Sequence, residues 1–270
     1  MLTSWMPHLL EIHCSDKGAV ACYAGVPSRP SRVLHRTVAS FPGLLVPVLT
    51  LWAAQGTRVL NDPVDAFRAR DKLLTILALQ QSGVPTVATL TSYEPSLAGL
   101  RMLGAGHMII KPAHGVRGEG IVVHASPEAV AAGWAPVQWL PGSGPGGHYS
   151  VREHYLAQPL VREGGQDIRA FVVAGQCLGL MRRFARPGEV RANLALGGVA
   201  VALDLDHPGA STAVAAVKAC GLDYAGVDIV EDEDGVLRVL EVDAWAGFAG
   251  MTEVTGADIA GAIVSSAISR

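Results

Sequence analysis

Apolar and polar residues alternate along two neighbouring stretches near the end of the chain and predict a β-hairpin. An apolar stretch, AGVDIV, is followed by the turn EDEDG, and the alternation returns over 236–242. Residues two apart on a strand point to the same face, so Glu241 and Asp243 should project together, and Asp228 can face them from the other strand. The pattern therefore predicts three carboxylates on one strongly apolar hairpin.

The same reading predicts short strands mixed with helices along the rest of the chain. Asp62 should cap a helix that begins at Pro63 and runs to about Ser82, because aspartate is a preferred N-cap and proline fits the first helical turn. Ala174-Gly175 should form a two-residue hairpin turn. An antiparallel, hairpin-rich pattern of this kind indicates an α+β fold. The other expected helices are 44–55, 96–103, a short one within 126–148, 211–220 and 258–268; the expected strands are 19–26, 57–61, 86–90, 107–111, 155–161, 168–173 and 176–183.

Composition excludes several classes of protein. The chain has 270 residues, a net charge of -3 and 17% charged residues, and without a basic block it is not expected to bind nucleic acid. Its longest apolar run, 43–54, contains Pro47 and is shorter than the ~20 residues of a membrane span, so no membrane association is expected. The N-terminus lacks the basic region of a signal peptide. Cytoplasmic localisation and reduced thiols are expected, because four cysteines are scattered without paired spacing, namely Cys14, Cys22, Cys177 and Cys220.

The carboxylates of the hairpin are candidate metal ligands. Burying unpaired carboxylates costs several kcal/mol each, and a hard cation with oxygen ligands removes that cost. Mg²⁺ typically takes one or two carboxylates together with substrate phosphates. Any one of the three acids could instead reach solvent at a strand end, but the trio favours a metal site made by Asp228, Glu241 and Asp243.

A set of basic and glycine residues could bind phosphate opposite these acids. Lys72 should lie midway along the helix from Pro63, and Lys111 should end a strand just before a glycine-containing turn. Glycines let main-chain N–H groups approach phosphate oxygens closely, lysines supply point charges, and arginine supplies a planar fork. Each residue alone could be an ordinary surface residue, and their combination makes them candidates. The remaining members are Gly115, Gly118 and Gly120 in the turn, followed by Arg191 and Asn193.

The order of these motifs resembles that of the ATP-grasp ligases. RARDK is followed by IIKPAHGVRGEGI, QDIRAFVV, MRR with RANLALGG, LDYAGVDIV and VLEVD. Within that superfamily the chain is most similar to the RimK-like α-L-glutamate ligases, from about Leu44 to the C-terminus. The resemblance implies two α+β sub-domains that grip ATP, after a short N-terminal α/β domain. The implied boundaries are 1–61 for the N-terminal domain and 62–270 for the ATP-grasp domain, with 107–161 as its lid.

The resemblance also implies roles for individual residues. Two Mg²⁺ ions, or Mn²⁺ in their place, would be held by the three hairpin acids. Arg191 would stabilise the reacting acyl group as the catalytic residue, and Arg182 and Arg183 are candidates to hold the carboxylates of glutamate. The implied ATP-binding residues are Lys72, Lys111, Gly115, Gly118, Gln158, Pro159, Leu160, Asp167, Arg191 and Asn193.

The chain departs from the family pattern in three places. The usual E-x-N of the metal site reads Glu241-Val242-Asp243, so a carboxylate replaces an amide. Gln158 takes the place of an acidic residue in the strand that offers its main chain to adenine. The contact to the adenine amino group, which distinguishes ATP from GTP, then depends on main-chain carbonyls. The N-terminal domain is shorter than in most relatives. The segment VLHRTVASF also resembles RimK-like proteins linked to tetrahydromethanopterin or methylofuran.

The implied reaction is ATP-dependent ligation of a carboxylate to an amine. The carboxylate attacks the γ-phosphate, ADP leaves, and the amine of an amino acid, L-glutamate by resemblance, attacks the acylphosphate to form an amide. The acceptor would be a peptide or a small molecule, and a C1-carrier cofactor is an example of the latter. The protein could be a monomer or an oligomer. The alternatives are other ATP-grasp chemistry, as in a dipeptide ligase or a kinase-like phosphoryl transfer, and a non-catalytic nucleotide-binding module.

Overall fold

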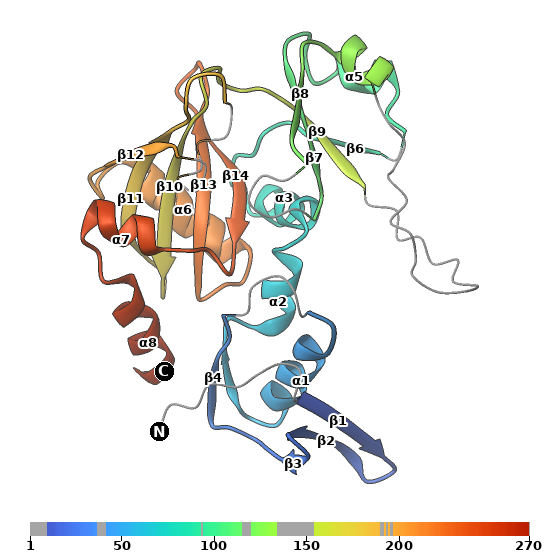
Figure 1. Cartoon of the computed structure of the whole chain (residues 1–270), viewed down its shortest axis with the longest axis vertical. Helices are drawn as coiled ribbons and strands as arrows, with labels where there is room; N and C mark the ends of the chain where they lie inside the picture. Colours follow the sequence, from blue (N-terminus) through green and yellow to red (C-terminus); the bar gives the residue numbers. More distant parts are fainter. Residues whose placement is uncertain are drawn as a thin grey trace.

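The N-terminal part of the chain forms a small α/β unit (Figure 1). The computed structural model describes residues 10–36, 42–92, 94–114, 120–133, 154–189, 192, 194 and 197–269. In the N-terminal unit, one helix packs on a three-stranded antiparallel sheet, and a parallel strand pair leads into the rest of the chain. The elements are β1 (Leu10–Ser15), β2 (Gly18–Tyr23), β3 (Val26–Pro27), β4 (Arg32–Leu34), α1 (Pro42–Ala54) and β5 (Arg58–Leu60).

The helix expected from Pro63 to about Ser82 is in fact two helices, α2 (Pro63–Arg68) and α3 (Lys72–Gln81). Asp62 caps α2 as expected, accepting hydrogen bonds from the first-turn N–H groups. Asp71 caps α3 in the same way, and an N-cap residue has non-helical backbone angles, so the first helix ends before it. Lys72 is therefore the first residue of a helix and does not lie in the middle of one.

A four-stranded antiparallel sheet follows, with strand order β6-β9-β7-β8. Two short helices cover one face, where Leu100 and Val130 pack against Met108, Ile110 and Ala157. The other face turns toward α3, where Ile76 packs against Ala113 and Leu156. The elements are β6 (Leu90–Ser92), α4 (Leu97–Arg101), β7 (Met108–Pro112), β8 (Val122–His124), α5 (Pro127–Gly133) and β9 (Tyr155–Pro159).

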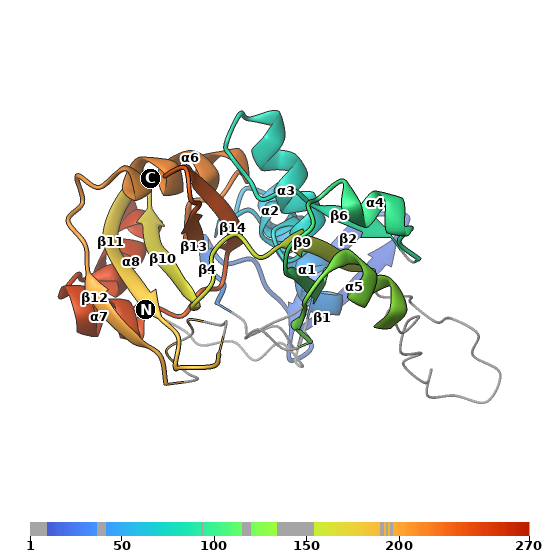
Figure 2. The ribbon, with the colours of Figure 1, turned by 90° about the horizontal axis from the view of Figure 1, so that it is seen from above.

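The C-terminal half is a five-stranded antiparallel sheet of order β12-β11-β10-β13-β14 with helices on both faces (Figure 2). Ile168, Ala170, Val227 and Ile229 on one face pack against α6. On the other face Phe171, Met181 and Tyr224 pack against α7 and α8. The elements are β10 (Gln166–Val173), β11 (Gln176–Phe184), β12 (Val199–Ala202), α6 (Pro208–Ala219), β13 (Tyr224–Glu231), β14 (Leu237–Asp243), α7 (Ala249–Thr255) and α8 (Ile259–Ser269).

Most expected elements are present, and the exceptions have local causes. The strand expected at 86–90 is wrong: Thr86 makes a single parallel bridge to Val239, and β6 begins only at Leu90. Helix α6 begins three residues before the expected Ser211, because His207 caps it and Pro208 occupies its first position. Strands β1, β4 and β12 and helix α7 were not expected. Among the described residues, no helix is long and apolar enough to cross a membrane.

Candidate active site

The candidate site is built on the face of the five-stranded sheet that lies opposite α6. Residues directly opposite each other in an antiparallel pair project from the same face. Asp167 lies opposite Arg183, and Arg169 lies opposite Asp228. Since the alternate residues of these strands pack under α6, the four charged side chains must project from the other face and gather there.

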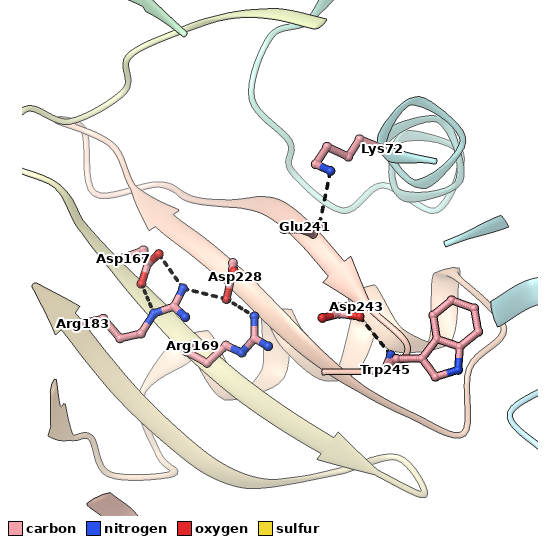
Figure 3. A network of polar contacts seen from close by, with 8 residues as sticks. All are labelled: Lys72, Asp167, Arg169, Arg183, Asp228, Glu241, Asp243 and Trp245. Atoms are coloured by element: carbon pink, nitrogen blue, oxygen red, sulfur yellow. Dashed lines mark hydrogen bonds and ion pairs between the residues drawn. The ribbon is translucent and has the colours of Figure 1, made fainter. Parts of the chain in front are cut away.

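These four side chains form one hydrogen-bonded network (Figure 3). Arg183 donates Nε and Nη2 to the two oxygens of Asp167, each at 2.7 Å, and its Nη2 also lies 3.0 Å from Oδ1 of Asp228. Arg169 donates from Nη1 to the same Oδ1 at 2.6 Å. Burial tends to raise the pKa of Asp228, but the two guanidinium groups outweigh it and lower the pKa below its usual value. Asp228 is thus held as a carboxylate in a fixed orientation.

Glu241 lies opposite Asp228 on β14 and contacts a different cation. Its Oε1 is 3.5 Å from Nζ of Lys72, at the first residue of α3. Although 38% of the Glu241 side chain is open to solvent, the protein around it, together with the neighbouring charges of Asp228 and Asp243, raises its pKa. This mutual repulsion of carboxylates is what a bound cation relieves.

The three hairpin acids lie along one hairpin but do not form a tight cluster. Asp228 turns toward the arginines, Glu241 toward Lys72, and Asp243 accepts a hydrogen bond from the main-chain N–H of Trp245 at 2.9 Å (Figure 3). Within the described ranges, no three His, Cys, Asp or Glu residues are grouped closely enough to hold a metal ion. The donor set still fits Mg²⁺, because it offers oxygen ligands of like charge on one face. A metal site at these residues stays a prediction.

Lys111 reaches the same region from the four-stranded sheet. It lies on β7 opposite Leu156, and Leu156 packs against α3, so Lys111 projects from the face that carries this contact. The main-chain N–H of Lys72 donates to the carbonyl of Ala113, just after β7, at 3.1 Å. This hydrogen bond ties the start of α3 to the four-stranded sheet. Burial, aided by the nearby charge of Lys72 and opposed by Glu241 and Asp228, lowers the pKa of Lys111 to about 8. The two lysines expected to bind phosphate therefore flank Glu241.

The strand expected to present its main chain to adenine is β9. Gln158 is 3% exposed and donates from Nε2 to Oγ1 of Thr89 at 2.8 Å, and Pro159 ends the strand. The N–H of Leu160 donates to His107 at 2.8 Å. The Gln158 amide and the Leu160 N–H are thus already engaged within the protein. Adenine binding at this strand stays a prediction.

The two arginines expected to hold glutamate do not act together. Consecutive residues of a strand point to opposite faces, so only Arg183 reaches the charged face. Arg182 lies opposite Ile168 on the face covered by α6, and its Nη2 is 3.4 Å from Oε2 of Glu231. Binding of glutamate by Arg182 and Arg183 stays a prediction, with one arginine on each face of the sheet.

Four of the expected site residues, Gly115, Gly118, Arg191 and Asn193, lie outside the described residues. Their roles stay predictions. Conversely, sequence reasoning did not select Arg169, whose guanidinium contacts a predicted metal ligand. Its signal was available: in QDIR it is two residues from Asp167, so the two must share a face of the strand.

Lys111 gives the first testable prediction. Bound phosphate should raise the lowered pKa of Lys111 again, so ATP binding at about pH 8.5 should take up a proton. The affinity should also fall as the pH of the medium rises above 8. Calorimetry in two buffers of different ionisation enthalpy measures this uptake. Lys111→Met should abolish it and weaken ATP binding at least ~10-fold, about 1.4 kcal/mol.

The control is Lys218→Met, at an exposed position on α6, which should leave both quantities unchanged. A proton uptake that persists in Lys111→Met would contradict this reading of the site.

Comparison with known proteins identifies the family. Residues 69–267 match the model of the RimK-like ATP-grasp domain. The chain is 34% identical to a "Probable alpha-L-glutamate ligase" of Alkalilimnicola ehrlichii, over 95% of this chain and 80% of that protein, and 34% identical to a protein of the same name from Stutzerimonas stutzeri, over 80% and 69%.

Solved structures show the same fold. The chain resembles the ATP-grasp ligase PsnB in complex with a minimal precursor, with a TM-score of 0.70, 23% identity and coverage of 98% of this chain and 87% of that one. It also resembles a RimK domain ATP-grasp protein of Sphaerobacter thermophilus, with a TM-score of 0.62 at 20% identity, covering 90% and 84%. The α+β fold is thus an ATP-grasp fold. The chain belongs to the RimK-like ATP-grasp family of ATP-dependent acid–amino-acid ligases.

Proposed function

We propose that this ligase joins the amine of L-glutamate to a carboxylate acceptor and uses ATP to activate the acceptor. The observation that carries the proposal is the meeting of two sheets around Glu241, where lysines from α3 and β7 face the carboxylates of β13 and β14. The names of the relatives at 34% identity support L-glutamate as the amine.

The reaction has two balanced steps. An oxygen of the acceptor carboxylate attacks the γ-phosphorus of ATP, the bond to the β,γ-bridging oxygen breaks, and ADP leaves. The nitrogen of glutamate, after losing a proton, then attacks the acylphosphate carbon, and inorganic phosphate leaves as the amide forms. No protein nucleophile is required, so the work of the protein is positioning and charge stabilisation.

The residues have distinct roles in this proposal. Lys72 and Lys111 bind the phosphates of ATP, and Arg191 stabilises the acylphosphate and its tetrahedral adduct. The hairpin acids would hold two Mg²⁺ ions, which would neutralise charge on the phosphates. Arg183 and Arg169 keep Asp228 ionised and oriented.

The domain organisation follows the same proposal. Residues 1–61 form the N-terminal domain and 62–270 the ATP-grasp domain, with 107–161 closing as a lid so that water does not hydrolyse the acylphosphate. The acceptor is a small molecule or a peptide, and a C1-carrier cofactor is one member of the panel to be assayed.

Trapping with hydroxylamine tests the acyl step. Carboxylate acceptor, ATP and Mg²⁺ without the amine should give a hydroxamate, because hydroxylamine attacks an acylphosphate. Adding L-glutamate should replace the hydroxamate with an amide, identified by mass spectrometry. Without hydroxylamine, repeated turnover with ADP release should depend on both the acceptor and L-glutamate.

Other outcomes would contradict the proposal in recognisable ways. A stable phosphorylated product that resists hydroxylamine would indicate a kinase. An amide formed with another amino acid but not with L-glutamate would indicate a different ligase. No ADP release with any acceptor would indicate a nucleotide-binding module.

A further inference from the structure

Arg36 of the N-terminal unit reaches across to the C-terminal half. It follows β4 and donates from Nη2 to the carbonyl of Ala246 at 2.8 Å, just beyond the end of β14. Its guanidinium carbon lies 4.8 Å from the ring centroid of Phe248 and 5.7 Å from that of Tyr224. The side chain is thus held in place by the Ala246 carbonyl, by the ring of Phe248 and by Tyr224, where burial raises the pKa of the phenol against the charge of Arg36 and a side-chain hydrogen bond.

One end of this guanidinium lacks a partner. Nη1 of Arg36 is buried and makes no hydrogen bond, and in the part of the chain that the structure describes Arg36 forms no ion pair with a carboxylate. Buried donors almost always have acceptors, and an unsatisfied charged group is costly to bury. If Arg36 only joined the two halves of the protein, the hydrogen bond of Nη2 and the ring contacts would be explained, but the burial of Nη1 without an acceptor would not. An anionic acceptor would satisfy both this donor and the positive charge of the guanidinium.

The surroundings place this acceptor at the end of the metal-ligand hairpin. Ala246 is the third residue after Asp243, a predicted metal ligand. Between them, Trp245 lies edge-on to the ring of His35, at a centroid distance of 6.0 Å. A second cation, Arg70 from the α2–α3 junction, lies with its guanidinium carbon 5.9 Å from the Trp245 ring centroid. The segment after β4 and the α2–α3 junction therefore bring two arginines and an imidazole ring to this loop.

We propose that Arg36 binds a substrate carboxylate that does not become part of the new amide. This carboxylate would lie against the loop that follows β14. The proposal rests on the ligase function proposed above. An arginine fork matches a carboxylate, and aromatic flanks hold it in orientation. The reacting carboxylate belongs near the phosphate-binding lysines, which lie on α3 and β7, whereas Arg36 comes from the N-terminal unit. The carboxylate comes from L-glutamate or from the acceptor.

Calorimetric titrations in which both the protein and the ligand are varied test this proposal. Wild type, Arg36→Met and Arg36→Lys are titrated by calorimetry with L-glutamate, L-glutamine and L-glutamate α-amide, each with and without Mg²⁺ and a non-hydrolysable ATP analogue. N-acetyl-L-glutamate serves as the acceptor probe. Arg101→Met is the matched control, because Arg101 is exposed and pairs with Glu128 on the surface. Thermal unfolding confirms that each variant is folded, and Arg36→Lys keeps the positive charge should Arg36→Met be unstable.

We expect Arg36→Met to weaken glutamate binding at least ~10-fold and to erase the preference for glutamate over the amide that lacks the contacted carboxylate. Arg36→Lys should lose less, and nucleotide affinity should stay unchanged. A loss confined to N-acetyl-L-glutamate supports the proposal with the acceptor as the source of the carboxylate. Equal affinities of wild type and Arg36→Met for every carboxylate would overturn it.

The experiment distinguishes a failure of the proposed ligase function from a failure of the inference about Arg36. A wild type that binds no nucleotide refutes that function, while the titrations without nucleotide still decide whether Arg36 binds a carboxylate. A folded wild type that binds none of the carboxylates overturns the inference.

Discussion

Replacing Glu241 with glutamine should reduce ADP release on the order of 10³-fold while leaving the protein folded. Glutamine keeps the shape and one oxygen of the side chain but removes the charge that would hold Mg²⁺, and a bound metal contributes several kcal/mol of charge stabilisation in the transition state. The substitution also removes the negative charge that lies 3.5 Å from Nζ of Lys72 at the start of α3. The measurement is steady-state ADP release over a range of Mg²⁺ concentrations.

The matched control for this experiment is Glu253→Gln on α7, an exposed carboxylate that is not among the proposed site residues. It should keep wild-type turnover. If Glu241→Gln retains more than about a tenth of wild-type activity at saturating Mg²⁺, Glu241 does not hold a catalytic metal.

Gly226→Ala should impair both stability and turnover, because there is no room for a methyl group at this position. A Cβ on Gly226 would lie 2.5 Å from the Cβ of Ala246 and 2.7 Å from Nη2 of Arg169. Overpacking of this kind typically costs ~1–3 kcal/mol. Relief of the contact must move Arg169, which then no longer orients Asp228. Loss of such support to a metal ligand typically lowers metal affinity or activity ~10–100-fold. Urea unfolding and Mg²⁺-dependent ADP release measure the two effects.

Gly106→Ala is the control, since a Cβ there meets nothing within 4 Å and the residue does not need a positive φ. It should change the free energy of unfolding by less than about 0.5 kcal/mol. Full Mg²⁺-dependent activity in Gly226→Ala would show that the position of Arg169 does not affect the site.

The sequence predicted the local features of this fold well, because local rules suffice for them. Alternation predicted the hairpin of β13 and β14, and the register places Asp228 opposite Glu241. The turn expected at Ala174-Gly175 is present, with φ of 51° and 79° at the two positions, as a two-residue hairpin turn requires. The order of motifs predicted the family, which the comparisons confirm.

The features that were missed have local as well as tertiary causes. The break between α2 and α3 depends on Asp71 acting as a cap, and the apolar periodicity around it gave no sign of a helix end. Arg182 and Arg183 were expected to act on one ligand, although strand alternation sends them to opposite faces. The partners of Asp228 come from two other strands, and pairing between distant strands cannot be read from local spacing.

The boundary drawn at residue 61 divides the chain at a point where the structure is continuous. Asn61 is fully buried, donates to the carbonyl of Tyr224 at 2.9 Å, and accepts from the N–H groups of Asp223 and Tyr224 at 2.7 and 2.9 Å. One amide thus completes the main-chain hydrogen bonding at the start of β13, a central strand of the other half. In evolutionary terms the N-terminal segment is not a freely exchangeable module. A homologous segment could replace it only with an amide at the same point, so recombination between relatives should preserve this junction even where their substrates diverge.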